Sequence, residues 1–128
     1  MRRAMFTEIV EAAGLHGRRL ILDVRLNWYR SLPLSCVERL EVTLDGQPAV
    51  PDVLEVAGRS HSVIDLPAED DTWWCVWDTA RLTATLAKVP APGSHRVQFV
   101  IGTRVPNLVL EPNRPLVVVD RADVEVSS

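Results

Sequence analysis

Histidine spacing is the first indicator of metal chemistry in this 128-residue sequence. Its three histidines are His16, His61 and His95, and no two of them form HxH or HExxH. Those spacings place two imidazoles on one side of an element, where both can bind one zinc ion. Because only the loops of the fold could bring these rings together, the sequence predicts no metal site on this chain.

Motifs for a nucleophile are also missing. Cys36 and Cys75 have no basic neighbour other than Arg39 and Arg81, so we favour buried, inert thiols over reactive ones. Their separation matches neither a redox CxxC nor a zinc pattern, and we expect both thiols to be reduced. No GxSxG, GxGxxG or P-loop motif occurs, and the acidic run 69–71 is typical of a solvated loop. The sequence therefore predicts no catalytic residue on this chain.

Tryptophans are the stronger signal, because three of the four lie in segment 73–77. If this segment is extended, Trp73 and Trp77 share one face and Trp74 lies on the other. One face can fill a core, while the other forms an aromatic surface for a protein partner or a stacked sugar. The alternative is that Trp73, Trp74 and Trp77 all pack in the core or under a neighbouring loop.

Length and composition indicate one globular domain over residues 1–128. Domains commonly hold about 100 to 150 residues, and 47% of the side chains are apolar while 24% are charged. A net charge of −3 and scattered arginines argue against a nucleic-acid partner, whose phosphates require clustered positive charge. No apolar run approaches the roughly 18 residues of a membrane span. Glu8 and Glu11 interrupt what would be a signal peptide, so we expect a cytoplasmic protein.

Alternating apolar and polar residues predict short strands along most of the chain. Leu20, Leu22, Val24, Leu26 and Trp28 share one face at period two, as in a half-buried antiparallel strand. The same pattern predicts strands at 39–44, 52–56, 60–66, 81–88, 96–101 and 116–126.

Turn residues separate these strands and define the fold class. Asp45-Gly46 and Gly58-Arg59 indicate hairpin turns, and the proline-rich run 90–93 ends the strand before it. Only Glu8–Leu15 has helical character, and it is too short to be stable alone. Seven to nine short strands with little helix predict an all-β, antiparallel β-sandwich, either immunoglobulin-like or a jelly roll.

The connection after the first strong strand is a second candidate site. Its side chains of interest are Tyr29, Arg30, Leu32, Pro33 and Leu34. Solvent exposure does not explain two leucines beside a proline, and loops on a rigid sheet commonly carry recognition. Tyrosine and arginine flanked by leucine suit a specific protein interface. The alternative is a corner that defines the fold, in which Tyr29 packs inward and Pro33 fixes the turn.

The same connection carries a resemblance to a known family. Tyr29-Arg30-Ser31-Leu32-Pro33-Leu34-Ser35, followed by an acidic and hydrophobic strand and Asp45-Gly46, resembles the Tyr-Arg-Gly-Leu-Pro-Leu-Ser pattern of the small (beta) subunit of the C-glycoside deglycosidases. The resemblance covers about eighteen contiguous residues. Ser31 stands where the family pattern has glycine, and similarity over the rest of the chain is looser.

The resemblance implies a two-subunit lyase that cleaves C-glycosides, such as plant flavonoid glucosides, after oxidation of the sugar 3-hydroxyl to a ketone. A carbon–carbon glycosidic bond offers no lone pair to protonate, so two-carboxylate hydrolysis acts poorly on it. The 3-ketone acidifies the C2 hydrogen, a base removes it, and the aglycone leaves from C1 while a divalent metal stabilises the enolate. In the family the base and the metal, usually manganese, belong to a large (alpha) subunit resembling a sugar-phosphate isomerase/epimerase.

These implications lead to the hypothesis of a non-catalytic small subunit, inactive alone, within a heterodimer or higher hetero-oligomer. The 29–34 connection then contacts the catalytic barrel and supports or covers its active-site mouth, where water must be excluded. The competing hypothesis is a stand-alone carbohydrate- or protein-binding module with segment 73–77 as its platform. A small autonomous enzyme is a third.

Overall fold

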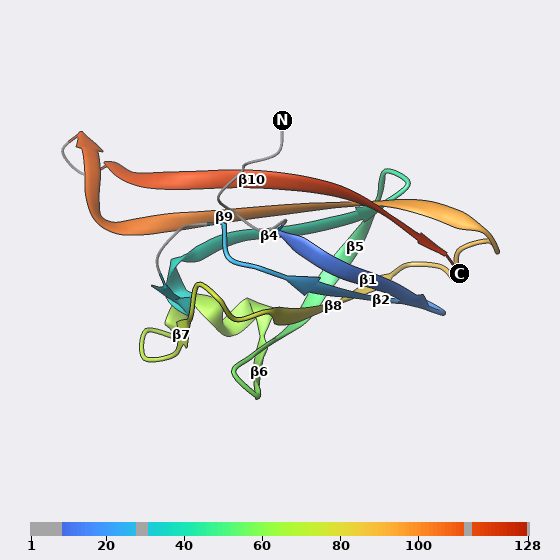
Figure 1. Cartoon of the computed structure of the whole chain (residues 1–128), viewed down its shortest axis with the longest axis horizontal. Helices are drawn as coiled ribbons and strands as arrows, with labels where there is room; N and C mark the ends of the chain where they lie inside the picture. Colours follow the sequence, from blue (N-terminus) through green and yellow to red (C-terminus); the bar gives the residue numbers. More distant parts are fainter. Residues whose placement is uncertain (1–8, 28–30, 112–113, 128) are drawn as a thin grey trace.

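The computed structural model describes residues 9–27, 31–111 and 114–127, and nearly all of them form antiparallel strands (Figure 1). In chain order the elements are β1 (Val10–His16), β2 (Arg19–Val24), β3 (Leu32–Pro33), the 3₁₀ helix η1 (Leu34–Cys36), β4 (Val37–Leu44), β5 (Gln47–Val56), β6 (Arg59–Ser62), the 3₁₀ helix η2 (Val63–Ala68), β7 (Trp73–Trp74), β8 (Ala80–Leu86), β9 (Ser94–Glu111) and β10 (Arg114–Ser127). Neither helix in these ranges has the length and apolar character needed to cross a membrane.

Eight of the strands form one sheet in the order β1-β2-β8-β5-β4-β9-β10, with β6 paired to β5. Its neighbouring strands are antiparallel. The two ends of this path, β1 and β10, lie against each other, so the sheet curls into a nearly closed barrel. The predicted all-β antiparallel fold is confirmed. The two layers expected of a sandwich are opposite walls of this single curled sheet.

The barrel interior is filled by the side chains that the alternation places on one face. Leu20, Leu22 and Val24 of β2 are fully buried, and so are Phe99 and Ile101 of β9. These are the inward faces that the sequence predicts. Burial of one such side chain contributes about 1.5 to 3 kcal/mol, so the core rather than any local propensity stabilises the strands.

Two tight turns use consecutive residues with positive φ. Asp45 and Gly46 have φ of 49° and 83°, and Ala57 and Gly58 have φ of 54° and 79°. Two such residues in a row match the twist of antiparallel strands, and glycine takes this conformation without steric cost. The predicted Asp45-Gly46 hairpin is confirmed, while the second turn lies one residue earlier than expected.

Two expectations about secondary structure are wrong. Of the expected helical segment Glu8–Leu15, Glu8 lies outside the described residues and residues 10–15 belong to β1, because the turn at Gly17 (φ 62°) lets this strand pair with β2. The strand expected at 60–66 ends at Ser62, where β6 leaves the edge of the sheet and the chain forms η2 with Pro67 inside it. Alternation alone does not reveal where a strand runs out of partners.

Asn27 connects strands from opposite ends of the sheet path. It follows β2 and is 6% exposed, and its Nδ2 donates to the carbonyl oxygens of Ile101 in β9 at 3.3 Å and Val118 in β10 at 3.0 Å. Its Oδ1 accepts a hydrogen bond from the fully buried hydroxyl of Thr103 at 2.9 Å. One side-chain amide therefore provides hydrogen-bond partners for two backbone carbonyl groups and one hydroxyl group where the barrel closes.

We expect Asn27→Ala to lower the free energy of unfolding by roughly 2 to 4 kcal/mol, because it leaves several buried polar groups without partners. Thr103→Val removes one of these hydrogen bonds and should cost about half as much. Urea denaturation monitored by far-UV circular dichroism measures both changes. A loss below about 0.5 kcal/mol for Asn27→Ala, the range of ordinary surface substitutions, would contradict a role in closing the barrel.

Candidate functional site

The two segments that the sequence singles out lie side by side at one end of the barrel. β3 and β7 pair as a separate two-stranded antiparallel sheet, at the left of Figure 1. The pairing continues into η1, where the Leu34 N–H donates to the Thr72 carbonyl at 2.9 Å and the Ser35 N–H to the Glu69 carbonyl at 3.0 Å. The proline connection and the tryptophan segment, about forty residues apart in sequence, therefore form one structural unit.

Ser31 and Arg25 attach the turn after β7 to the barrel. The Ser31 Oγ accepts a hydrogen bond from the Val76 N–H at 2.9 Å, and Arg25 Nη2 donates to the Val76 carbonyl at 3.3 Å. Arg25 also forms an ion pair with Glu11 of β1 at 3.1 Å. Glycine, the residue of the family pattern at position 31, has no hydroxyl to make the first of these contacts.

The structure corrects the predicted interface at the proline connection. Leu32 is 3% exposed and Leu34 is fully buried, so both side chains belong to the core and neither can contact a partner. Their pairing with β7 turns them inward, which the sequence pattern alone does not show. Pro33 is half-buried beside β7. Tyr29 and Arg30 lie outside the described residues, so their predicted contacts stay predictions.

The tryptophans divide between core and surface. Trp74 is fully buried, and its Nε1 donates to the Asp78 carbonyl at 3.0 Å, so Trp74 lies on the face that fills the core and does not belong to the possible aromatic surface. Trp73 and Trp77 are 51% and 78% exposed. The expected extended segment 73–77 stops after Trp74, because a turn follows in which the Asp78 N–H donates to the Cys75 carbonyl at 2.9 Å.

A third large apolar side chain is exposed on the neighbouring helix. Ile64 of η2 is 87% exposed, and η2 packs against η1 beside the β3–β7 pair. We call Ile64, Trp73 and Trp77 the tryptophan end. Large exposed apolar side chains on a braced scaffold are typical of protein interfaces or ligand platforms.

The histidines occupy separate places in the barrel. His16 is at the turn of the β1–β2 hairpin, while His61 of β6 lies 3.9 Å from the Glu69 carboxylate. The His61 Nε2 is buried without a hydrogen-bond partner in the described part of the chain. In that same part, no three His, Cys, Asp or Glu side chains gather into a group that could hold a metal ion. Cys36 and Cys75 are both free thiols.

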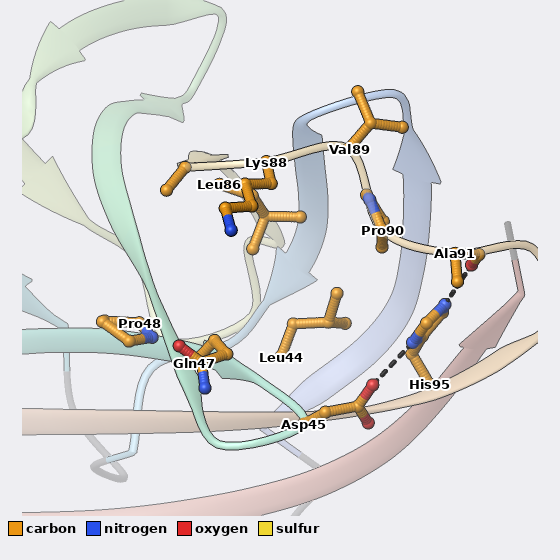
Figure 2. Close-up of a pocket in the computed structure, with 11 residues that line it drawn as sticks. Leu44, Asp45, Gln47, Pro48, Leu86, Lys88, Val89, Pro90, Ala91 and His95 are labelled. Carbon is orange, nitrogen blue, oxygen red and sulfur yellow. Dashed lines mark hydrogen bonds and ion pairs between the residues drawn. The ribbon is translucent and has the colours of Figure 1, made fainter.

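A cavity of about 530 Å³ opens at the opposite end of the barrel from the tryptophan end (Figure 2). It lies between loop 87–93 and the ends of β4, β5 and β8. Its walls are mostly apolar and include Leu44, Pro48, Leu86 and Pro90. It therefore has the size and character of a small-molecule site.

His95 fixes loop 87–93 against this cavity. Its Nδ1 lies 2.6 Å from Asp45 Oδ2 and its Nε2 lies 2.6 Å from the Ala91 carbonyl oxygen, as Figure 2 shows. Because both partners only accept hydrogen bonds, both ring nitrogens must donate, which requires the imidazolium form. These contacts, first with Asp45 and then with Ala91, raise the pKa of His95 above 6.5. The Arg96 N–H and then His95 lower the pKa of Asp45 below 3.8.

Comparison with known proteins identifies the family. Residues 2–107 match a family model described as C-glycoside deglycosidase beta subunit. The chain belongs to the C-glycoside deglycosidase beta subunit family. The resemblance predicted from residues 29–46 is confirmed, and the matched stretch includes both the tryptophan end and the cavity.

Known beta subunits are similar to this C-glycoside deglycosidase beta subunit family member over most of its length. A C-glycoside deglycosidase beta subunit from Microbacterium trichothecenolyticum is 32% identical over 112 residues, which are 84% of this chain and 85% of the relative. A protein of the same name from Arthrobacter globiformis is 31% identical over 107 residues, 80% of this chain and 82% of its own. A 3'-dehydrocarminate deglycosidase beta subunit from a Microbacterium species is 37% identical over 89 residues, 66% of this chain and 65% of its own.

The contact between Asp45 and His95 is not apparent from the sequence, because the two residues lie fifty positions apart. β4 ends at Leu44, just before Asp45, and β9 begins at Ser94, just before His95; the two strands are antiparallel neighbours, with Leu44 opposite Val97. The register of β4 against β9 places the hairpin turn beside the histidine. Only the pairing of these two strands, which alternation does not specify, brings the charges together.

We expect the His95 contacts to stabilise this family member most between about pH 4 and pH 6.5. The raised pKa of His95 means that its contribution is complete below 6.5 and is lost as pH rises through the higher folded value. The lowered pKa of Asp45 means that its contribution is present above 3.8 and is lost in stronger acid. The melting temperature of wild type minus that of His95→Gln should therefore be largest near pH 5.5 and shrink at alkaline pH.

His16→Gln, which removes an exposed histidine, is the control for the loss of an imidazole. Its melting temperature should follow that of wild type at every pH. An equal destabilisation by His95→Gln at pH 5.5 and pH 9 would show that the imidazolium is not what holds loop 87–93.

Proposed function

We propose that this chain is the non-catalytic small subunit of a heteromeric C-glycoside deglycosidase, and that it docks on a large catalytic subunit through the tryptophan end. Membership of a family of beta subunits carries the proposal. The relatives are named as subunits of deglycosidases, which supports a heteromer with a second polypeptide.

The tryptophan end replaces the proline connection as the proposed contact. Trp73 and Trp77 offer large, rigid indole surfaces, and aromatic side chains of this kind dominate the binding energy of protein interfaces. The β3–β7 pair and the Val76 contacts hold them in place before binding, which lowers the entropy cost of association. The buried Leu32 and Leu34 act beneath this surface as its support.

The chemistry that we propose for the complex is elimination from a 3-oxo-C-glycoside. A base removes the acidified C2 proton, and the resulting enolate forms a C1–C2 double bond as the C1–aglycone bond breaks. The bonding electron pair leaves with the aglycone carbon, which then takes up a proton, so the step needs no glycosidic oxygen. An enolate is protonated readily by water, so a subunit that covers the mouth of the site protects it. We propose that this chain provides that cover.

The base, the manganese ion and the isomerase/epimerase-like fold of the large subunit stay predictions. Among the described residues no group of three His, Cys, Asp or Glu side chains could hold such an ion, so we propose that it is held by the large subunit. The cytoplasmic location also stays a prediction.

The purified chain alone should not cleave a 3-oxo-C-glucoside, and activity should appear when the large subunit from the same organism is added. The measurement is chromatographic detection of the released aglycone as the ratio of the two subunits is varied. Turnover should saturate at a fixed stoichiometry. Cleavage by the lone chain, at a rate that scales with its concentration alone, would contradict the proposed role.

Trp77→Ala should weaken binding of the large subunit by roughly thirtyfold, the change that corresponds to a hot-spot loss of about 2 kcal/mol. Trp73→Ala and Ile64→Ala should weaken it less, since the Trp73 indole is less exposed and Ile64 is a smaller side chain without an aromatic ring. Isothermal titration calorimetry measures the dissociation constants. Because Trp77 is mostly exposed, its replacement should leave the melting temperature unchanged.

Val50→Ala is the matched control, because Val50 is also a large apolar side chain, 64% exposed, but lies on β5 near the cavity end. It should not change the dissociation constant. Unchanged binding by Trp73→Ala and Trp77→Ala together would rule out the tryptophan end as the contact.

A stand-alone carbohydrate-binding module is the second candidate function, favoured by the same exposed indoles. Titrating the lone chain with glucose and with a C-glucoside, while tryptophan fluorescence is measured, distinguishes the binding module from the subunit. Saturable quenching that Trp77→Ala abolishes would support the module, whereas the subunit proposal expects a response only after the large subunit is added.

A further inference from the structure

The cavity between loop 87–93 and the ends of β4, β5 and β8 is distinct from the tryptophan end. Figure 1 places the β4–β5 turn and the start of β9 at the opposite end of the barrel from β7. Its volume of about 530 Å³ lies within the range of small-ligand sites, roughly 300 to 1,000 Å³. A function here would be separate from partner docking.

Lys88 gives this cavity its charge. It is the only lysine in the sequence, and Figure 2 shows its side chain turned from loop 87–93 toward the space above Leu44 and Gln47. Within the described residues its ammonium group has no ion-pair or hydrogen-bond partner. The other cation at the cavity, His95, is neutralised by Asp45. The cavity therefore keeps one free positive charge in a chain whose net charge is −3.

The lining excludes two common classes of ligand. Of the polar side chains that line the cavity, Asp45 and His95 bind each other, which leaves only Gln47 and Lys88. A sugar would therefore leave most of its hydroxyl groups against apolar walls, and unpaired buried hydroxyls are costly. A nucleotide carries several phosphate charges, and a single lysine cannot neutralise them. The class of ligand that fits this lining is a compact apolar molecule with one negative charge.

We propose that this cavity binds a small apolar carboxylate, whose hydrocarbon or aromatic part packs on Leu44, Pro48, Leu86 and Pro90 and whose carboxylate pairs with Lys88. The site is largely preformed, because the His95 side chain links loop 87–93 to the β4–β5 turn through Ala91 and Asp45. A preformed wall spares the ligand the entropy cost of ordering the loop. The proposal does not depend on the large subunit.

Titration of the ¹⁵N-labelled full chain with 2-naphthoate tests the site. We expect saturable amide shifts confined to residues around the cavity, such as Leu44, Gln47, Lys88 and Ala91. Naphthalene-2-methanol, which has the same apolar body without the charge, should bind at least fivefold more weakly. Saturable shifts centred on Trp73 and Trp77 instead, or no saturable shifts, would overturn the proposal.

Charge variants separate the role of Lys88 from general attraction to a cation. Lys88→Gln should weaken 2-naphthoate binding at least fivefold and leave binding of the neutral alcohol unchanged, while Lys88→Arg should retain most of the affinity for the acid. Arg59→Gln removes another exposed cation, at the start of β6, and should have no effect. Equal losses for Lys88→Gln and Arg59→Gln, or no loss for Lys88→Gln, would overturn the proposal. These readouts need neither turnover nor a partner, so they can fail while the proposed subunit function holds.

Discussion

The barrel depends on how its seam, the junction between the first and last strands β1 and β10, is closed. The sheet path runs from β1 to β10, and among the described residues no backbone ladder joins these two strands. The amide of Asn27, which follows β2, reaches the carbonyls of Ile101 in β9 and Val118 in β10 instead, with the Thr103 hydroxyl as its third contact. A polar side chain in this position is stable only because each of its hydrogen-bonding atoms has a partner. Closing the barrel in this way helps to keep the interior apolar side chains away from water.

A short non-local pairing builds the tryptophan end on this frame. β3 and β7 are two residues each, yet their pairing buries Leu32, Leu34 and Trp74 and leaves Trp73 and Trp77 outside. The same contact therefore creates a core extension and an exposed surface. A connection with apolar residues can therefore support the proposed interface although its own leucines are buried beneath it. The family pattern around the proline then reflects support of the surface, since its leucines are internal.

Local alternation predicted the strands and their inward faces. Every second side chain of a strand lies on the same face of the sheet, and in this fold that face packs on the core. Leu20 to Val24 and the buried face of β9 are examples, and so is the hairpin at Asp45-Gly46. The candidate site was predictable only in part. Which side of the 73–77 segment faces solvent depends on where β7 ends, and that is decided by pairing with a segment about forty residues away. Contacts across such distances, including that of Asp45 with His95, follow from strand order, which composition and spacing do not specify.

The two ends of the barrel are joined by continuous strands. β4 begins at η1 beside the tryptophan end and finishes at Leu44 in the cavity wall, a run of seven residue steps or roughly 23 Å. Molecules held at the two ends do not compete for the same atoms, so a ternary assembly is sterically allowed. If occupation of one end changes affinity at the other, thermodynamic reciprocity requires an equal effect in the opposite direction. A curled sheet of this size thus provides a single rigid body through which two binding equilibria can be linked.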